Sequence, residues 1–131
     1  MGQLIPVDAE ALTVAFLRDV MPDTNVSTRT DRRAGQITVE QTGGPRVNVV
    51  TDLPMLAIQC WGTTTTEASA LCRAAYAHLL GMRDHPTLGH LVREVSTFGG
   101  VSHFPDPLTD AERYQVSVQL NLRPTENGEL P

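Results

Sequence analysis

The chain has 131 residues, of which 40% are apolar, and a net charge of −5; this length suits one domain, residues 1–131, rather than two. No apolar run approaches the roughly 20 residues that span a bilayer, and the first residues lack the pattern of a secretory signal, so we expect a cytosolic protein without membrane contact. The acidic balance argues against a nucleic-acid clamp, and the ten basic residues are all arginines, which excludes P-loop and Schiff-base lysines.

A helix is predicted over residues 8–21. Asp8 is a suitable N-cap, and apolar residues then recur at helical spacing: Leu12, Phe16, Leu17 and Val20. Pro22 ends the helix, because the residue before a proline disfavours the α region.

Short extended stretches follow. Residues 25–29 form one, and residues 36–41 alternate apolar and polar side chains. Gly43, Gly44 and Pro45 are typical turn residues, and residues 46–50 then resume the alternation. The sequence therefore predicts a hairpin in which this turn joins strands 36–41 and 46–50. No helix follows the two glycines, so they do not indicate a phosphate cradle.

The next strand, residues 56–61, leads directly into a second helix. Leu56, Ile58 and Cys60 share one face of this strand. Thr64 and Glu67 fit a capping box, and Gly81 is a natural C-terminal cap. Between them runs an apolar stripe, which consists of Ala68, Leu71, Cys72, Ala75 and Leu79.

The last third of the chain predicts a short turn after Met82, a strand over residues 91–98, a loop over 105–110 and a final strand over 114–123. The final strand carries the clearest pattern in the chain, because Val116, Val118, Leu120 and Leu122 occupy every second position. Residues 124–131 are polar and predict a flexible tail. The fold class is therefore α+β, a mainly antiparallel sheet flanked by two principal helices.

The polar face of the final strand is a candidate interface. It consists of Gln115, Ser117, Gln119 and Asn121. None of these side chains is an acid or a base, so they suit hydrogen bonding to a partner surface better than catalysis.

Residue types of known catalytic and metal sites are present without the usual spacing. The four histidines, His78, His85, His90 and His103, lack HExxH spacing, and the cysteines are too far apart for a CxxC pair. We read the histidines as solvated, and Cys60 and Cys72 as buried thiols rather than a disulfide. Ser102, His103 and Asp106 contain the types of a hydrolase triad, but adjacent Ser and His rarely face each other and no GxSxG elbow exists. We expect no catalytic residue, no metal and no cofactor.

Two further features have two readings each. Arg29, Arg32 and Arg33 form either a solvated loop or a clamp onto the carboxylates of a neighbouring subunit. Trp61 either packs locally or anchors an interface, where tryptophan is enriched.

Several short stretches resemble the tail terminator, or tail completion, proteins of long-tailed bacteriophages, especially those of actinobacterial hosts. The stretches span nearly the whole chain: the Val7–Leu12 helix start, Val26–Arg29, Leu53–Gly62 leading into a Thr/Glu/Ala-rich helix, Gly99-Gly100, Pro105–Pro107 and Arg113-Tyr114 before the last strand.

The resemblance implies a single α+β domain that assembles into a homo-hexameric ring on the head-proximal end of the tail tube. Such a ring ends polymerisation of the major tail tube protein and offers a docking surface to a head–neck connector protein. It implies a virion protein, made in the host cytoplasm, without enzymatic activity or cofactor. Two alternatives stay open: another head–tail joining protein of the neck, or a small cytosolic ligand-binding or enzymatic protein that uses the His85–His103 region.

The alternation in the final strand generates a first prediction. Leu120→Asp places a carboxylate on the buried face and is expected to cost several kcal/mol out of a total of about 5–15 kcal/mol, which unfolds the domain. Gln119→Ala on the polar face leaves the fold intact. Thermal unfolding followed by circular dichroism compares the two variants, and equal destabilisation of both would show that the faces are misassigned.

Overall fold

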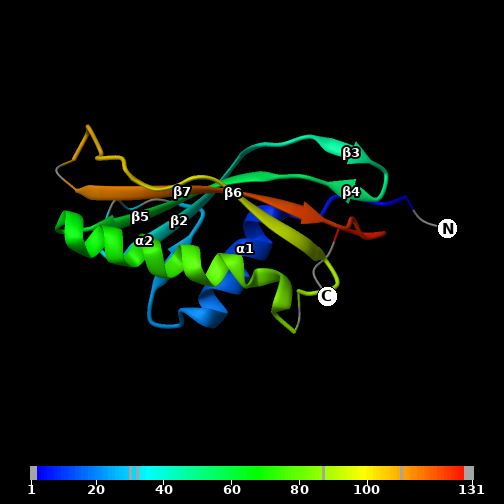
Figure 1. Ribbon diagram of the computed structural model, residues 1–131, viewed down its shortest axis with the longest axis horizontal. Coiled ribbons are helices and arrows are strands. Elements are labelled where there is room, and N and C mark those ends of the chain that lie inside the picture. The colour runs from blue at the N-terminus through cyan, green and yellow to red at the C-terminus, as the bar shows by residue number, and fades with distance from the viewer. Residues whose placement is uncertain (1–2, 30, 32, 87, 110, 129–131) are drawn as a thin grey trace.

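An antiparallel sheet with α1 and α2 on one of its faces makes up the protein in the computed structural model (Figure 1), which describes residues 3–29, 31, 33–86, 88–109 and 111–128. The helices are α1 (Ala9–Val20), α2 (Thr65–Leu80) and the short 3-10 helix η1 (Met82–Asp84). The strands are β1 (Asn25–Ser27), β2 (Gln36–Gly43), β3 (Arg46–Asn48), β4 (Thr51–Asp52), β5 (Met55–Gly62), β6 (Val92–His103) and β7 (Glu112–Leu122). The predicted α+β class is confirmed.

The sheet is built outward from the pair β5 and β7, which run antiparallel from Met55↔Gln119 to Gly62↔Glu112. On the β5 side, β2 adds antiparallel and β1 adds parallel to β2. On the other side of β7 lies β6. The sequence-distant strands are therefore neighbours, in the order β1-β2-β5-β7-β6.

The core lies between the sheet and the two helices. Leu56, Ile58 and Cys60 of β5 and the alternate residues of β7 point to this side and are buried. Figure 1 shows α1 and α2 on the same side of the sheet, which leaves the other side without a helix. The predicted alternation in β7 is confirmed, since Val116, Val118, Leu120 and Leu122 are buried and the residues between them are half-buried.

The helix ends follow their predicted caps. The Asp8 carboxylate accepts from the Ala11 amide at 3.0 Å. At the start of α2, the Thr64 hydroxyl accepts from the Glu67 amide at 3.2 Å. The Glu67 carboxylate reaches back to the Thr63 amide at 3.3 Å, one residue before the position that a capping box predicts.

The predicted hairpin around Gly43–Pro45 is wrong. β2 pairs with β5, and β3 pairs with β4, so residues 36–43 and 46–48 belong to one side of a longer hairpin whose tip is Val49-Val50. Gly43-Gly44-Pro45 is an irregularity within it, at which Gly44 has φ +109° and a Cβ added there would lie 2.1 Å from the Leu53 carbonyl oxygen. Gly44 permits a close approach between the two sides of this hairpin, and the chain does not reverse direction here.

The other boundaries differ less. The strand predicted over residues 91–98 begins at Val92 and continues to His103 through a bulge at Gly99 and Gly100, which both have positive φ. The predicted flexible tail differs from the structure over residues 124–128: Pro124 is buried, and Thr125 exchanges backbone hydrogen bonds of 2.7 and 3.1 Å with Ile5. Residues 129–131 lie outside the described residues.

The close approach at Gly44 generates a second prediction. Gly44→Ala must place a methyl group against the backbone of Leu53 and Pro54 in addition to straining a positive φ, whereas Gly43→Ala meets open space and suffers the strain alone. We expect Gly43→Ala to cost about 1 kcal/mol and Gly44→Ala at least about 1 kcal/mol more. Urea unfolding of the two variants measures the difference, and equal costs would rule out the close approach.

Candidate assembly surface

The sheet face that points away from α1 and α2, hereafter the open face, consists mainly of uncharged polar side chains. Its centre is formed by Gln115, Ser117, Gln119 and Asn121 of β7, Met55, Ala57 and Gln59 of β5, Thr38 of β2, and Ser96 and Phe98 of β6. Charged residues stand toward its margins, with Glu40 beside Ala57 and Glu94 beside Asn121. The structure thus brings together the four predicted polar residues of β7.

Four side chains along the open face are hydrogen-bonded to one another. The Trp61 indole donates to the Thr38 hydroxyl at 3.5 Å, and this hydroxyl donates to Gln59 at 3.2 Å. Gln59 in turn donates to the Gln115 side-chain oxygen at 3.2 Å. Such a network fixes the positions of the amides before any partner arrives, and it contains no group that titrates near neutral pH.

Trp61 lies at one end of this face and is only 1% exposed. The Arg113 guanidinium covers it, with its central carbon 4.9 Å from the Trp61 ring centroid and 4.4 Å from that of Phe104. Of the two predictions for Trp61, local packing or an interface anchor, the structure of the single subunit agrees with local packing. The aromatic side chain that is exposed beside it is Phe104.

The arginine loop is anchored by a buried glutamine. Gln36, 1% exposed, donates from its amide to the Arg29 carbonyl at 2.8 Å and accepts from the Asp31 amide at 2.9 Å. Arg29 and Arg33 are exposed, while Arg32 lies outside the described residues. The loop therefore holds two exposed arginine side chains on a backbone that Gln36 fixes. This arrangement suits contact with the carboxylates of a partner protein.

In the residues that the structure describes, the candidate catalytic and metal-binding side chains do not assemble into a site. His103 bonds to Glu112 at 2.7 Å and stacks on Tyr114, while the Ser102 hydroxyl bonds to the Gln115 carbonyl. Asp106 is occupied within its own loop, where it accepts from the Thr109 hydroxyl at 2.7 Å. Among the described residues, no group of His, Cys, Asp and Glu is placed to hold a metal ion.

The histidines differ in their surroundings. His78, His90 and His103 are exposed, as predicted. His85 is not a simple surface residue: it is half-buried, bonds to Asp19 at 2.7 Å, and its ring meets Phe16 edge-on. It holds the segment after α2 against α1, which is a structural role.

Cys60 and Cys72 are buried free thiols, as predicted. The interaction with Cys72, together with burial, raises the pKa of the Cys60 thiol well above its ordinary value. Cys60 is therefore protonated and is a poor nucleophile.

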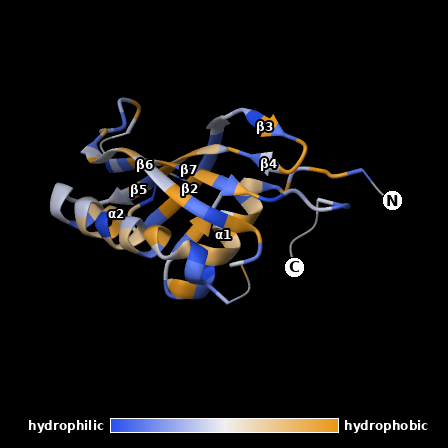
Figure 2. Ribbon diagram, turned by 45° about the vertical axis from the view of Figure 1, so that its right-hand side comes forward, coloured by the Kyte–Doolittle hydropathy of each residue, from blue (hydrophilic) through white to orange (hydrophobic). Residues whose placement is uncertain are grey.

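A second exposed feature, which was not predicted from the sequence, is the β3–β4 hairpin over residues 46–52, hereafter the arm. Its side chains Val47, Val49 and Val50 are 58%, 69% and 45% exposed. Figure 2 shows hydrophobic colouring at this projection, which stands clear of the helices. The sequence does contain a signal for this exposed arm, the run Val47-Asn48-Val49-Val50. Its valines fall on both faces of a short strand, so they cannot all point into one core.

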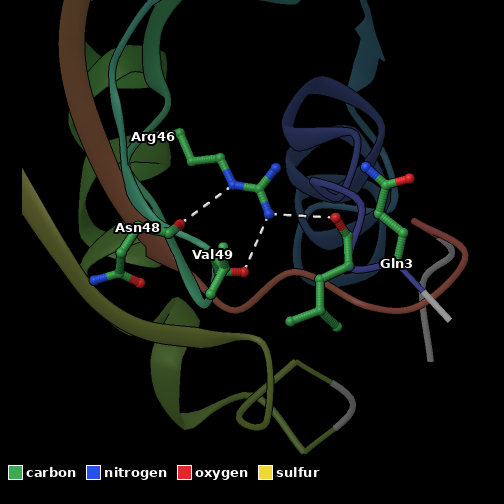
Figure 3. A pocket seen from close by; sticks show the side chains of 5 residues that line it. Gln3, Arg46, Asn48 and Val49 are labelled. Atoms are coloured by element: carbon green, nitrogen blue, oxygen red, sulfur yellow. Dashed lines mark hydrogen bonds between the residues drawn. The ribbon is translucent and has the colours of Figure 1, made fainter. Parts of the chain in front are cut away.

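A hollow of about 400 Å³ separates the arm from the N-terminal segment (Figure 3) and is lined by Gln3, Leu4, Arg46, Asn48 and Val49. The Arg46 guanidinium crosses it and donates to three carbonyl oxygens, those of Leu4, Asn48 and Val49, at 3.1–3.2 Å. The polar groups of this hollow are thus directed at the chain itself, which identifies a structural brace rather than a ligand site.

No protein-family model matches the chain, and no curated protein matches it. Within the described part of the chain, no helix combines the length and the apolar character needed to cross a membrane.

The contact of the Arg113 guanidinium with the Trp61 ring generates a third prediction. Arg113→Ala removes the guanidinium between two aromatic rings, which we expect to cost about 0.5–2 kcal/mol and to shift the tryptophan emission to longer wavelength as water reaches the ring. The chain contains one tryptophan, so its fluorescence reports this site alone. Arg29→Ala serves as the control and leaves the emission unchanged, whereas an unchanged spectrum in Arg113→Ala would show that other groups exclude water from Trp61.

Proposed function

We propose that this chain is a structural subunit of a bacteriophage tail, which closes into a homo-hexameric ring on the head-proximal end of the tail tube. The observation that carries the proposal is the open face: a sheet surface that no helix covers, whose centre is uncharged and on which Thr38, Gln59 and Gln115 are already fixed by hydrogen bonds. Such a surface suits lasting contact between proteins. The resemblance to tail terminator proteins supports the same assignment.

The subunit has unlike projections at opposite ends, and this suits a terminator. In Figure 1 the arm stands at one end and the loop between β6 and β7 at the other. A terminator must match the growing end of the tube on one side and refuse the next tube subunit on the other. Head-to-tail contacts around a closed rotation fix both sides at once, which symmetric pairing does not.

The charge of the chain also supports this role. Each copy carries −5, so six copies carry about −30 (6 × −5). A ring through which DNA passes works best if its wall repels phosphate, because basic side chains would bind the backbone and slow its passage. No sequence-specific contact with nucleic acid is proposed.

The proposed partners are further copies of this chain, the major tail tube protein and a head–neck connector protein. The role is one of geometry, so we propose neither enzymatic activity nor a cofactor. The protein acts in the virion tail after assembly in the host cytoplasm.

The test of the proposed function, which is also the fourth prediction, is genetic. We expect a phage that lacks this gene to produce over-long tails unattached to filled heads, as seen by electron microscopy of the lysate. Complementation by a plasmid copy restores virions. Ser117→Glu, at the centre of the open face, fails to complement, while Ala74→Glu on the exposed side of α2 adds the same charge and complements.

Other results of the gene deletion would point to other functions. Tails of normal length that fail to join heads would identify a neck adaptor. Infectious virions without the gene would refute a structural role, and the alternative of a small ligand-binding protein would then take its place.

A further inference from the structure

The arm is uncovered on both of its faces. All residues from Gln41 to Val50 are exposed in the free subunit. A two-stranded ribbon in this position gains little from burial, and such ribbons are marginally stable on their own in water. An arm of this kind is stabilised by its own bonds, by a partner, or by both.

Internal bonds hold the arm in one conformation. Arg46 links the tip to the N-terminal segment through the Leu4 carbonyl, and Arg93 of β6 donates to the Thr51 hydroxyl at 3.0 Å. At the tip, the Asn48 side chain accepts from the Val50 amide at 2.9 Å. The valines are therefore presented in a fixed arrangement, which lowers the entropy cost of docking.

The composition of the arm suits a second copy of this chain. Copies that each carry −5 repel one another, so they meet most favourably where neither surface adds charge. Over the arm, residues 46–52, the charged residues are Arg46 and Asp52, which have opposite signs and are partners in the β3–β4 pairing. The arm thus carries no net charge in an acidic protein.

The centre of the open face, whose side chains are uncharged, is the matching surface. Phe98 stands on it, 46% exposed, beside Ser117 of β7. The Phe98 ring projects above the small Ser117 side chain, which leaves an apolar ring edge against which valine side chains can pack. Because the arm and the open face are unlike surfaces of one chain, their contact is head-to-tail and propagates from copy to copy.

We propose that the arm of one copy packs Val47, Val49 and Val50 against Phe98 on the open face of the next copy. This rests on the proposed function, since it names the contact that closes the ring. It assigns the arm to the ring itself rather than to the tube protein.

Cysteine cross-linking tests this contact, and the native thiols do not interfere because both are buried. A Val49→Cys, Ser96→Cys double variant, which keeps Phe98 and places the second thiol beside it on the open face, is treated at high protein concentration with a short bis-maleimide and run on a denaturing gel. We expect a ladder of covalent oligomers that ends at the ring size. A mixture of the two single variants gives one cross-linked dimer, and Leu80→Cys with Val49→Cys, which uses an exposed residue of α2 instead, gives no ladder.

The experiment distinguishes a wrong arm contact from a wrong proposed function. Rings seen by sedimentation or electron microscopy without a ladder would refute the arm contact and leave the ring intact. A cross-linked dimer from Val49→Cys alone would show that arms pair with arms, and a double variant that stays monomeric without any ladder would also refute the contact. As a second readout, Val47→Ser with Val49→Ser is expected to raise the concentration needed for assembly by about tenfold, while circular dichroism shows an unchanged fold.

Discussion

The pairing of β5 with β7 is the constraint on which the rest of the structure depends. These strands come from distant parts of the chain, and their register places Ile58 opposite Val116 and Leu56 opposite Val118 on the core face. The same register places Gln59 opposite Gln115 and Ala57 opposite Ser117 on the other face. A shift by one residue would exchange the two faces of the strand, burying amides and exposing aliphatic side chains. The core and the candidate surface are therefore two results of one alignment, and neither can change without the other.

Features that depend on neighbouring residues could be predicted from the sequence. α2 followed from Thr64, Glu67 and the apolar stripe, because capping and helical periodicity are local. The two faces of β7 followed from alternation alone, and with them the polar residues of the candidate surface. The parallel pairing of β1 with β2 and the central place of β7 in the sheet are decided by contacts across the whole chain, which no short pattern contains.

The wrong or undecided predictions also concern features that depend on contacts between distant parts of the chain. Gly43-Gly44-Pro45 contains strong turn residues, and local propensity cannot distinguish a chain reversal from an irregularity within a strand that needs the same backbone freedom. The real tip, Val49-Val50, lacks a turn signature because its stabilisation comes from elsewhere, namely the Asn48 side chain and the Arg46 guanidinium. Trp61 was ambiguous for a similar reason, since Arg113, which covers it, and Phe104, which contacts Arg113, lie more than forty positions further along the chain.

The bond from Arg46 to the Leu4 carbonyl ties the order of the arm to the ends of the polypeptide. Leu4 is held because its neighbour Ile5 pairs with Thr125, and that pairing closes a loop of nearly the full chain length. Ile5 and Thr125 form an isolated bridge with two backbone hydrogen bonds, whereas β5 and β7 pair over eight residues, so we expect these terminal contacts to open before the sheet. The arm, the N-terminal segment and the segment around Thr125 thus constitute one unit of low local stability. Their backbone amides should exchange hydrogen together and faster than those of β5 and β7, and a ring neighbour that seats the arm would protect the two chain ends as well.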